Sequence, residues 1–313
     1  MIHELPPEPG PPRPPVGWCC SYCGAPLEPR GGGLFCSAED RWFATHGAVH
    51  RLLPAERRQQ IQPFLEQYQR VRRDEGWRAE PGLPDVPTHH PHAGIWRRRA
   101  RHFRLGMSLL RARLGPGPWN VLEVGAGCCW AAARLIAQGH QVTAVDVNLD
   151  PEDGLPAADR LLSEPARLAR AEAEMDALPL AAESFDVVLA TGALHYARRP
   201  DRTLVELRRV TGRGGVLLVL DSPVYRRRRD GAAMVKARAR NHLRRYAAEG
   251  PAELQSSFFV YRELAPLFGN AGWRLEVHGW PGPAREWLRD RIELVRHGRR
   301  TARFPALMAR RER

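Results

Sequence analysis

A glycine-rich turn followed by a distant acid is the part of the sequence best suited to hold a nucleoside. Gly125 and Gly127 follow an apolar stretch, and glycine lets the backbone turn tightly while a ligand approaches main-chain N–H groups. A helical pattern comes next, so a partly positive helix N-terminus lies beside the turn. Asp146 ends the next apolar stretch, where a carboxylate can accept both hydroxyls of a ribose. The stretch 121–146 therefore predicts a nucleoside-cofactor site of unspecified kind.

A second group of residues with ligand chemistry lies near the start of the chain. Cys20 and Cys23 are separated by two residues and followed by a glycine, a spacing that aims two thiolates at one tetrahedral zinc ion. The glycine turn at 31–33 and the apolar residues before Cys36 predict a β-hairpin that returns a third thiolate. All six cysteines fall in two tight groups. This clustering is typical of metal ligation with incidental thiols, not of a secreted disulfide framework.

The bulk composition bounds the class of protein. With 313 residues, 43% of them hydrophobic, the chain can bury a full core and form one large domain plus a small one. It contains no apolar run that predicts a membrane span and no signal-peptide pattern, so we expect a cytoplasmic protein. The net charge of +13 invites a polyanion such as RNA as a partner. Because the 48 basic residues include a single lysine, Lys236, in a chain rich in Ala, Gly and Pro, the charge also fits a compositional bias.

The chain divides into four parts by composition and pattern. The first, 1–17, is Pro-rich, and we expect it to be extended and poorly ordered. The second, 18–54, is the small unit around the cysteines. Residues 55–118 carry two helical patterns separated by a Pro-punctuated loop. Residues 119–313 alternate between strand and helix patterns and include a basic helical insert at 225–250.

This alternation predicts an α/β fold with a doubly wound, Rossmann-like sheet and helices on both of its faces. Helices are expected at 55–80 and 95–114, ahead of the sheet, and at 283–295, between its last two strands. The expected strands are 120–124, 141–145, 168–173, 185–190, 215–220, 275–278 and 304–309.

Four segments of the sheet region share a pattern with one enzyme family. Glu123 begins an acid-x-Gly-x-Gly turn, and Asp146 stands at the position of a ribose-binding acid. Glu174 begins an acid-x-x-x-Leu-Pro segment followed by a Phe-Asp pair, and residues 204–215 match a helix with a Gly-Gly turn. On these segments, residues 119–311 resemble the class I S-adenosylmethionine-dependent methyltransferases, in the broad group that includes quinone-biosynthesis enzymes. The resemblance implies a seven-stranded sheet, S-adenosylmethionine as cofactor, methyl transfer as the activity, and helices before the first strand that cap the cofactor pocket.

The resemblance also assigns roles in the cofactor site. The glycine turn lies against the methionine and ribose portions of the cofactor, and Glu123 orients the turn and the cofactor's amino group. Asp146 holds the ribose hydroxyls. Glu174 accepts a hydrogen bond from the adenine amino group, with Asp176 as the alternative if the register differs by two. The predicted cofactor-binding residues are Glu123, Gly125, Ala126, Gly127, Asp146, Val147, Glu174, Met175, Asp176, Thr191 and Gly192.

The cysteine unit ends in an aromatic pair, Trp42 and Phe43, and a Gly-x-x-x-x-Leu-Leu-Pro segment at 47–54. In this it resembles the N-terminal zinc-ribbon module of some bacterial methyltransferases, including those that modify guanine in ribosomal RNA. The second ligand pair of that module is absent, because Glu39 and Asp40 stand at its cysteine and histidine positions. The alternative is a degenerate ribbon without metal; a bound zinc ion would be structural. The expected ligands are Cys20, Cys23, Cys36 and Glu39, with Asp40, Cys19, His46 or His50 as alternatives for the fourth.

The tip of the fourth strand of the chain, 190–196, should face both cofactor and acceptor. Methyl transfer to a hydroxyl or amine requires removal of a proton, and an imidazole titrates near neutrality, so His195 is the candidate general base. A structural histidine that packs under the cofactor is the alternative. The predicted substrate-face residues are Tyr196, Asp221, Tyr225 and Met234.

Several functions compete on the sequence. The first is a methyltransferase acting on a small molecule or lipid-like metabolite. The second is an RNA methyltransferase that holds an rRNA base through the ribbon and the basic surface. A dehydrogenase is disfavoured because Trp130 occupies the place of the third glycine in a dinucleotide fingerprint. A non-catalytic scaffold is disfavoured because Asp146 and the glycine turn are intact. The acceptor and the oligomeric state stay open.

Overall fold

The computed structural model describes residues 17–163, 167–246, 258–280, 288, 290–295 and 300–311. All but one residue of the predicted Pro-rich tail at 1–17 lie outside these ranges, as do most of the first half of the helix predicted at 283–295 and the last four residues of the predicted insert. Among the described helices, none combines the length and apolar character that crossing a membrane requires.

The centre of the molecule is a nine-stranded sheet in the order β13-β14-β10-β9-β6-β7-β8-β5-β4. The five strands from β10 to β8 are parallel, and β14 runs antiparallel between β10 and β13. All seven predicted strands are present, and two short strands from the N-terminal unit extend the sheet beyond β8. The strands are β4 Thr45–His46, β5 Val49–His50, β6 Asn120–Val124, β7 Gln141–Asp146, β8 Leu168–Glu172, β9 Phe185–Thr191, β10 Thr211–Leu220, β13 Trp273–His278 and β14 Ala306–Arg311.

Two apolar cores, one on each face, hold the sheet. Every residue of β6 is buried, as expected for a parallel strand covered on both sides. Successive side chains point to opposite faces, so Val121 belongs to one core and Leu122 to the other. Helices α2 (Ala93–Leu114) and α3 (Trp130–Ala137) contribute to the first core. Helices α4 (Pro200–Val210) and α6 (Tyr261–Asn270) contribute to the second.

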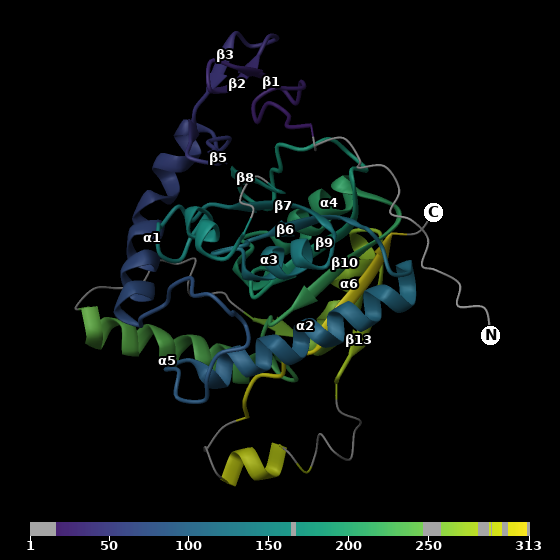
Figure 1. Ribbon diagram of the computed structural model, residues 1–313. Coiled ribbons are helices and arrows are strands. Elements are labelled where there is room, and N and C mark those ends of the chain that lie inside the picture. Colours follow the sequence, from purple (N-terminus) through teal and green to yellow (C-terminus); the bar gives the residue numbers. More distant parts are fainter. Residues whose placement is uncertain are drawn as a thin grey trace, which may run out of the picture.

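Two further helices lie around the sheet. Figure 1 shows α1 (Ala55–Asp74) descending from the small N-terminal unit beside the sheet toward α5 (Arg228–Tyr246), while α2 runs across the front of β10. Ile61 and Leu65 form the buried stripe of α1, at the helical spacing seen in the sequence. Helix α5 lies within the predicted basic insert. The remaining short elements are η1 (Leu155–Arg160), η3 (Leu194–Tyr196), β11 (Val224–Tyr225) and β12 (Phe259–Val260).

The N-terminal unit contains a three-stranded antiparallel sheet made of β1 (Glu28–Arg30), β2 (Gly33–Cys36) and β3 (Arg41–Phe43). Its apolar side chains join the second core instead of forming a core of their own. Trp18, Leu34 and Phe43 belong to the same buried cluster as Leu52 and Ala171 of the sheet region. The unit is therefore docked on the large sheet, both through this cluster and through β5.

Candidate functional site

The glycine turn after β6 and the acid that ends β7 form one hydrogen-bonded unit. Gly125 and Gly127 have φ values of +62° and +53°, which favour glycine. The N–H of Gly127 donates to Oδ2 of Asp146 at 2.7 Å, and the N–H of Asn148 donates to Oδ1 at 2.8 Å. Burial raises the pKa of Asp146, and these backbone donors oppose the rise. Each carboxylate oxygen keeps a second acceptor direction, which a ribose hydroxyl can use.

Glu123 lies beneath this turn. Its side chain is 1% exposed, and its Oε2 accepts the N–H of Ala132, in the first turn of α3, at 2.9 Å. Burial raises the pKa of Glu123 to about 8. The carboxyl is therefore protonated at neutral pH, and it caps α3 as a neutral group.

Two neighbouring cavities open above the turn, with volumes of about 160 Å³ and 100 Å³. They share walls at Gly125, Asp146 and Met175. The larger cavity extends toward the ends of β6 and β9, and the smaller one extends toward the loop after β8. Apart from Glu123, every predicted cofactor residue lines one or both of them. The larger is lined by Gly125, Ala126, Gly127, Asp146, Val147, Met175, Thr191 and Gly192, and the smaller by Gly125, Asp146, Val147, Glu174, Met175 and Asp176.

Aromatic side chains from α1 and α2 cover the larger cavity. Phe64 and Tyr68 reach it from α1, and Trp96 reaches it from α2. Trp96 meets Trp130 edge to face at 5.8 Å between ring centroids, so Trp130 fills the space between α2 and α3. The sequence predicted helices that cap the cofactor pocket but not which of their side chains line the cavity. The helical spacing of Phe64 and Tyr68 was the pattern that could have indicated these side chains.

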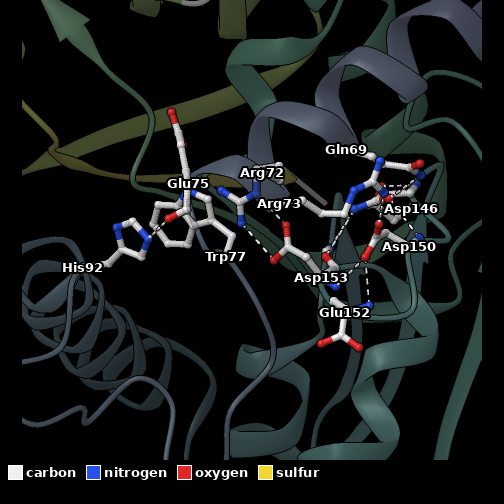
Figure 2. Close-up of polar contacts among 12 residues, drawn as sticks. Gln69, Arg72, Arg73, Glu75, Trp77, His92, Asp146, Asp150, Glu152 and Asp153 are labelled. Atoms are coloured by element: carbon white, nitrogen blue, oxygen red, sulfur yellow. Dashed lines mark hydrogen bonds and ion pairs between the residues drawn. The ribbon is translucent and has the colours of Figure 1, made fainter.

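Ion pairs bind α1 to the loops at the carboxyl ends of the strands. Arg72 donates to both oxygens of Asp153, at 2.5 and 2.9 Å, and Arg73 pairs with Asp150 at 2.9 Å. Figure 2 shows these residues side by side, with α1 above the loop that follows β7. The arginine-rich face of α1 is thus engaged with carboxylates of the large domain.

The first turn of α1 reaches the acid predicted to bind adenine. Arg57 donates to both oxygens of Glu174, at 2.6 and 2.7 Å. Both residues line the smaller cavity, beside Asp176. Burial, followed by the nearby Glu174 charge, raises the pKa of Asp176. Because Arg57 holds Glu174 in a fixed orientation, the remaining acceptor directions of that carboxylate are set for a ligand.

His195 lines a third cavity of about 350 Å³. This cavity lies between the end of η3 and the region of β12 and α6, with Phe259 and Leu264 in its wall. Burial lowers the pKa of His195 to about 3, assisted by the charges of Arg238 and Arg99, and Nδ1 lies 3.3 Å from the hydroxyl of Ser222. The imidazole is therefore neutral and only weakly basic at neutral pH. The general-base role of His195 stays a prediction.

The predicted substrate-face residues do not all lie together. Tyr196 lines both cavities above the turn, whereas Tyr225 lines a small separate cavity near the C-terminal segment. Met234 is half-buried on α5. Asp221 is buried, with Oδ1 at 2.9 Å from Nδ1 of His102. Burial acts to raise the pKa of Asp221, but His102 and nearby arginines hold it below its ordinary value.

Three of the predicted zinc ligands do converge. The Sγ atoms of Cys20, Cys23 and Cys36 lie within 4.8 Å of one another, and those of Cys23 and Cys36 are 3.6 Å apart. Two thiolates bound to one tetrahedral zinc ion at 2.3 Å are about 3.8 Å apart, so the spacing fits zinc. Burial acts to raise the pKa of Cys36, but the backbone N–H of Glu39 and the neighbouring thiols lower it overall.

The fourth ligand is not part of this cluster. Within the described residues, the group of converging ligand atoms contains only the three thiols. The cluster does not include the side chain of Glu39, whose main-chain N–H donates a hydrogen bond to Cys36. Nor does it include the alternatives Asp40, Cys19, His46 and His50. Nδ1 of His50 is instead hydrogen-bonded to the hydroxyl of Thr45 at 2.8 Å, and Nδ1 of His46 lies 3.2 Å from Nη1 of Arg51.

Comparisons with known proteins place this site in a family. Residues 122–219 match the family model described as a methyltransferase domain. Over 102 residues the chain is 39% identical to the uncharacterized protein Rv1403c of Mycobacterium tuberculosis, a match that spans 33% of this chain and 36% of that protein. The aligned part is thus about a third of the curated relative's length.

Solved structures of low sequence identity are also similar. One is the 1,6-didemethyltoxoflavin-N1-methyltransferase of Burkholderia thailandensis, with 19% identity, a TM-score of 0.47, and coverage of 87% of this chain and 96% of that one. Another is the phosphoethanolamine N-methyltransferase 2 of Haemonchus contortus, with 14% identity, a TM-score of 0.49, and coverage of 67% and 53%. Neither similarity bears on the acceptor of this protein.

The matched segment runs from β6 to β10 and contains the glycine turn, Asp146 and the Leu-Pro segment after Glu174. This part of the chain matches a methyltransferase domain, in agreement with the family resemblance seen in the sequence.

The high pKa of Glu123 predicts a pH-dependent stability. The folded state keeps this proton up to a pKa of about 8, whereas an unfolded glutamate loses it near pH 4.3. The folded state therefore binds more protons in this window, and the free energy of unfolding falls as pH rises through it. A Glu123→Gln variant lacks this titration, so its stability relative to the unmodified protein should increase by a few kcal/mol between about pH 5 and pH 8. Urea unfolding of both proteins measures this; a pH-independent difference would contradict it.

The thiol cluster predicts a structural metal ion. We expect the purified protein to carry about one zinc ion per chain, and Cys36→Ser to lose it together with thermal stability, because serine removes one thiolate ligand. Cys19→Ser is the matched control, since this cysteine lies in the same unit but outside the cluster. Elemental analysis of the three proteins gives the answer. Zinc-free unmodified protein would mean that apolar packing alone holds the unit.

Proposed function

We propose that this protein is a methyltransferase that transfers the methyl group of S-adenosylmethionine to a small-molecule acceptor. The observation that carries the proposal is the cover over the cofactor cavities. Phe64 and Tyr68 of α1 and Trp96 of α2 lie over the glycine turn, and ion pairs fix α1 in place. A site covered in this way suits a ligand that can be enclosed, and a base within a long RNA is a poor fit.

The two cavities suit the two ends of the cofactor. The smaller one offers Glu174, Asp176 and the apolar side chain of Ile61, a combination that fits adenine with its exocyclic amino group. The larger one offers the glycine turn and Thr191, whose hydroxyl is buried without a partner among the described residues. We place the methionine portion there. Asp146 lines both cavities and would hold the ribose between them.

The cofactor supplies an electrophilic methyl group on a sulfonium. The work of the chain is to hold the nucleophile in line with that methyl group and to exclude water. Tyr196, which lines both cavities, is the residue we assign to the acceptor side. The rings of Tyr196 and Tyr68 meet edge to face at 6.4 Å, so the two side chains together form an aromatic wall around the reacting atoms.

One observation favours the RNA alternative. Helix α5 carries arginines in its first and last turns and the only lysine of the chain, with Asp230 as its one acid. Several of these cations are exposed and form a basic surface. This helix packs near the C-terminal end of α1, where Arg245 donates to the carbonyl of Asp74. Phosphate groups of an RNA could bind there without entering the covered cavity.

Cofactor binding tests the proposal first. Asp146→Asn should weaken S-adenosylmethionine binding at least tenfold, because the ribose hydroxyls lose one charged acceptor. Asp85→Ala is the control, since Asp85 is an exposed aspartate on the surface. Isothermal titration of the three proteins measures the affinities. Absence of binding to the unmodified protein, or equal binding to Asp146→Asn, would refute the assignment.

A salt titration separates the two acceptor classes. We expect the affinity for a generic RNA to be weak at low salt and to vanish at physiological salt, as for non-specific contacts of exposed arginines. Replacing Arg244 and Arg245 of α5 by Gln should then lower the affinity for RNA and leave the affinity for the cofactor unchanged. Binding that stays tight at high salt, with a structured rRNA fragment preferred over bulk RNA, would instead support the RNA alternative.

A further inference from the structure

A half-buried arginine of α2 lines the larger cavity. Arg99 lines this cavity together with the glycine turn and Gly192. One of its terminal nitrogens lies 3.7 Å from the point where a Cβ on Gly192 would stand, so the guanidinium is next to the end of β9. Its carbon Cζ lies 4.7 Å from the ring centroid of Trp96 and 5.4 Å from that of Trp77. Both indoles thus lie within cation–π distance of the guanidinium, which lines the cavity.

This arginine differs from its neighbours in having no anionic partner. Arg72 is neutralised by Asp153, and Arg98 lies 3.4 Å from Asp221. Within the described part of the chain, Arg99 makes no hydrogen bond or ion pair, and its Nε is buried without a partner. Asp221 is the acid that most favours its charge, but no ion pair joins the two residues: Oδ1 of Asp221 is shared by His102 and Arg98, and its Oδ2 has no hydrogen-bond partner among the described residues.

A charge in this position is costly unless an anion joins it. Arginine stays protonated in proteins, and desolvation of the Arg99 guanidinium acts to lower its pKa by disfavouring the charged form. Thr191 adds a second polar group without a partner, since its Oγ1 is buried in the same cavity wall. A cation and a hydroxyl that both lack partners and line one cavity call for a ligand with a negative group and a hydrogen-bonding neighbour.

We propose that Arg99 binds the carboxylate of the cofactor's methionine portion, through the paired N–H groups of its guanidinium. The proposal rests on the proposed function, because that carboxylate is part of S-adenosylmethionine. Arginine presents a planar fork that matches a carboxylate in a bidentate manner, and the two neighbouring indoles restrict the movement of this fork in advance. The residue lies 26 positions before Gly125 in the chain, in a helix outside the matched family segment.

Two ligands that differ only at the amino-acid end test the proposal. S-Adenosylhomocysteine carries the α-carboxylate, whereas 5′-methylthioadenosine keeps the adenosine and the thioether but lacks the amino acid. In Arg99→Met we expect S-adenosylhomocysteine to bind ten- to hundredfold more weakly, and 5′-methylthioadenosine to bind within twofold of the unmodified protein. Arg99→Lys should recover part of the loss, because it restores the charge without the fork. Isothermal titration of both ligands with the three proteins measures these affinities.

Arg97→Met is the matched control. Arg97 lies on the same helix but is exposed, and its Nε donates to the carbonyl of Ala93. Equal weakening of both ligands by Arg99→Met would show a structural role and overturn the proposal, as would no weakening of either. Those outcomes leave the proposed function standing. Failure of the unmodified protein to bind S-adenosylhomocysteine would overturn the proposed function and this inference together.

Discussion

The row of arginine–carboxylate pairs between α1 and the carboxyl ends of the strands is the interaction on which the site depends. Glu172, at the end of β8, is buried and accepts from Arg51 and Arg58, and Asp153 accepts from Arg72. Each carboxylate is paired, as burial requires, so removing Arg72 would leave the charge of Asp153 without its partner, whereas Glu172 has two arginines. Because these pairs are spread along most of α1, they fix the helix at both ends, and the covered cavities exist only while it stays there.

Beneath that cover, two carboxyl groups whose pKa values burial raises organise the cofactor site. Asp146 is met by two backbone N–H donors, which oppose the effect of its burial. Glu123 has one such donor, and burial raises its pKa to about 8. Asp146 lines the cavities, whereas Glu123 lies under the turn and caps α3. One short segment thus supplies both an acceptor for hydroxyls and a rigid support for it.

The sequence predicted what local patterns encode, and it missed what distant segments build together. The strands and the residues around Gly125 and Asp146 follow from periodicity and turn chemistry. Arg57 and Glu174 are 117 residues apart, and no pattern in either segment indicates their pairing. The joining of β5 to β8 was missed for the same reason, since two residues carry no strand signal. The fourth zinc ligand was inferred from a family position; the Glu39 main chain donates to Cys36, and the Glu39 carboxylate is not among the converging ligand atoms of the described residues.

Two neighbouring residues of η3, His195 and Tyr196, line different cavities. Tyr196 lines the cavities above the glycine turn, and His195 lines the third cavity beyond η3. Their rings lie against each other, with 4.3 Å between the centroids. Among the described residues, Tyr196 and the aromatic cover line the larger cavity and no histidine does. Under the proposed function, a nucleophile that carries a free lone pair at neutral pH, and loses its proton to water after transfer, therefore suits this lining better than an alcohol that must be deprotonated first.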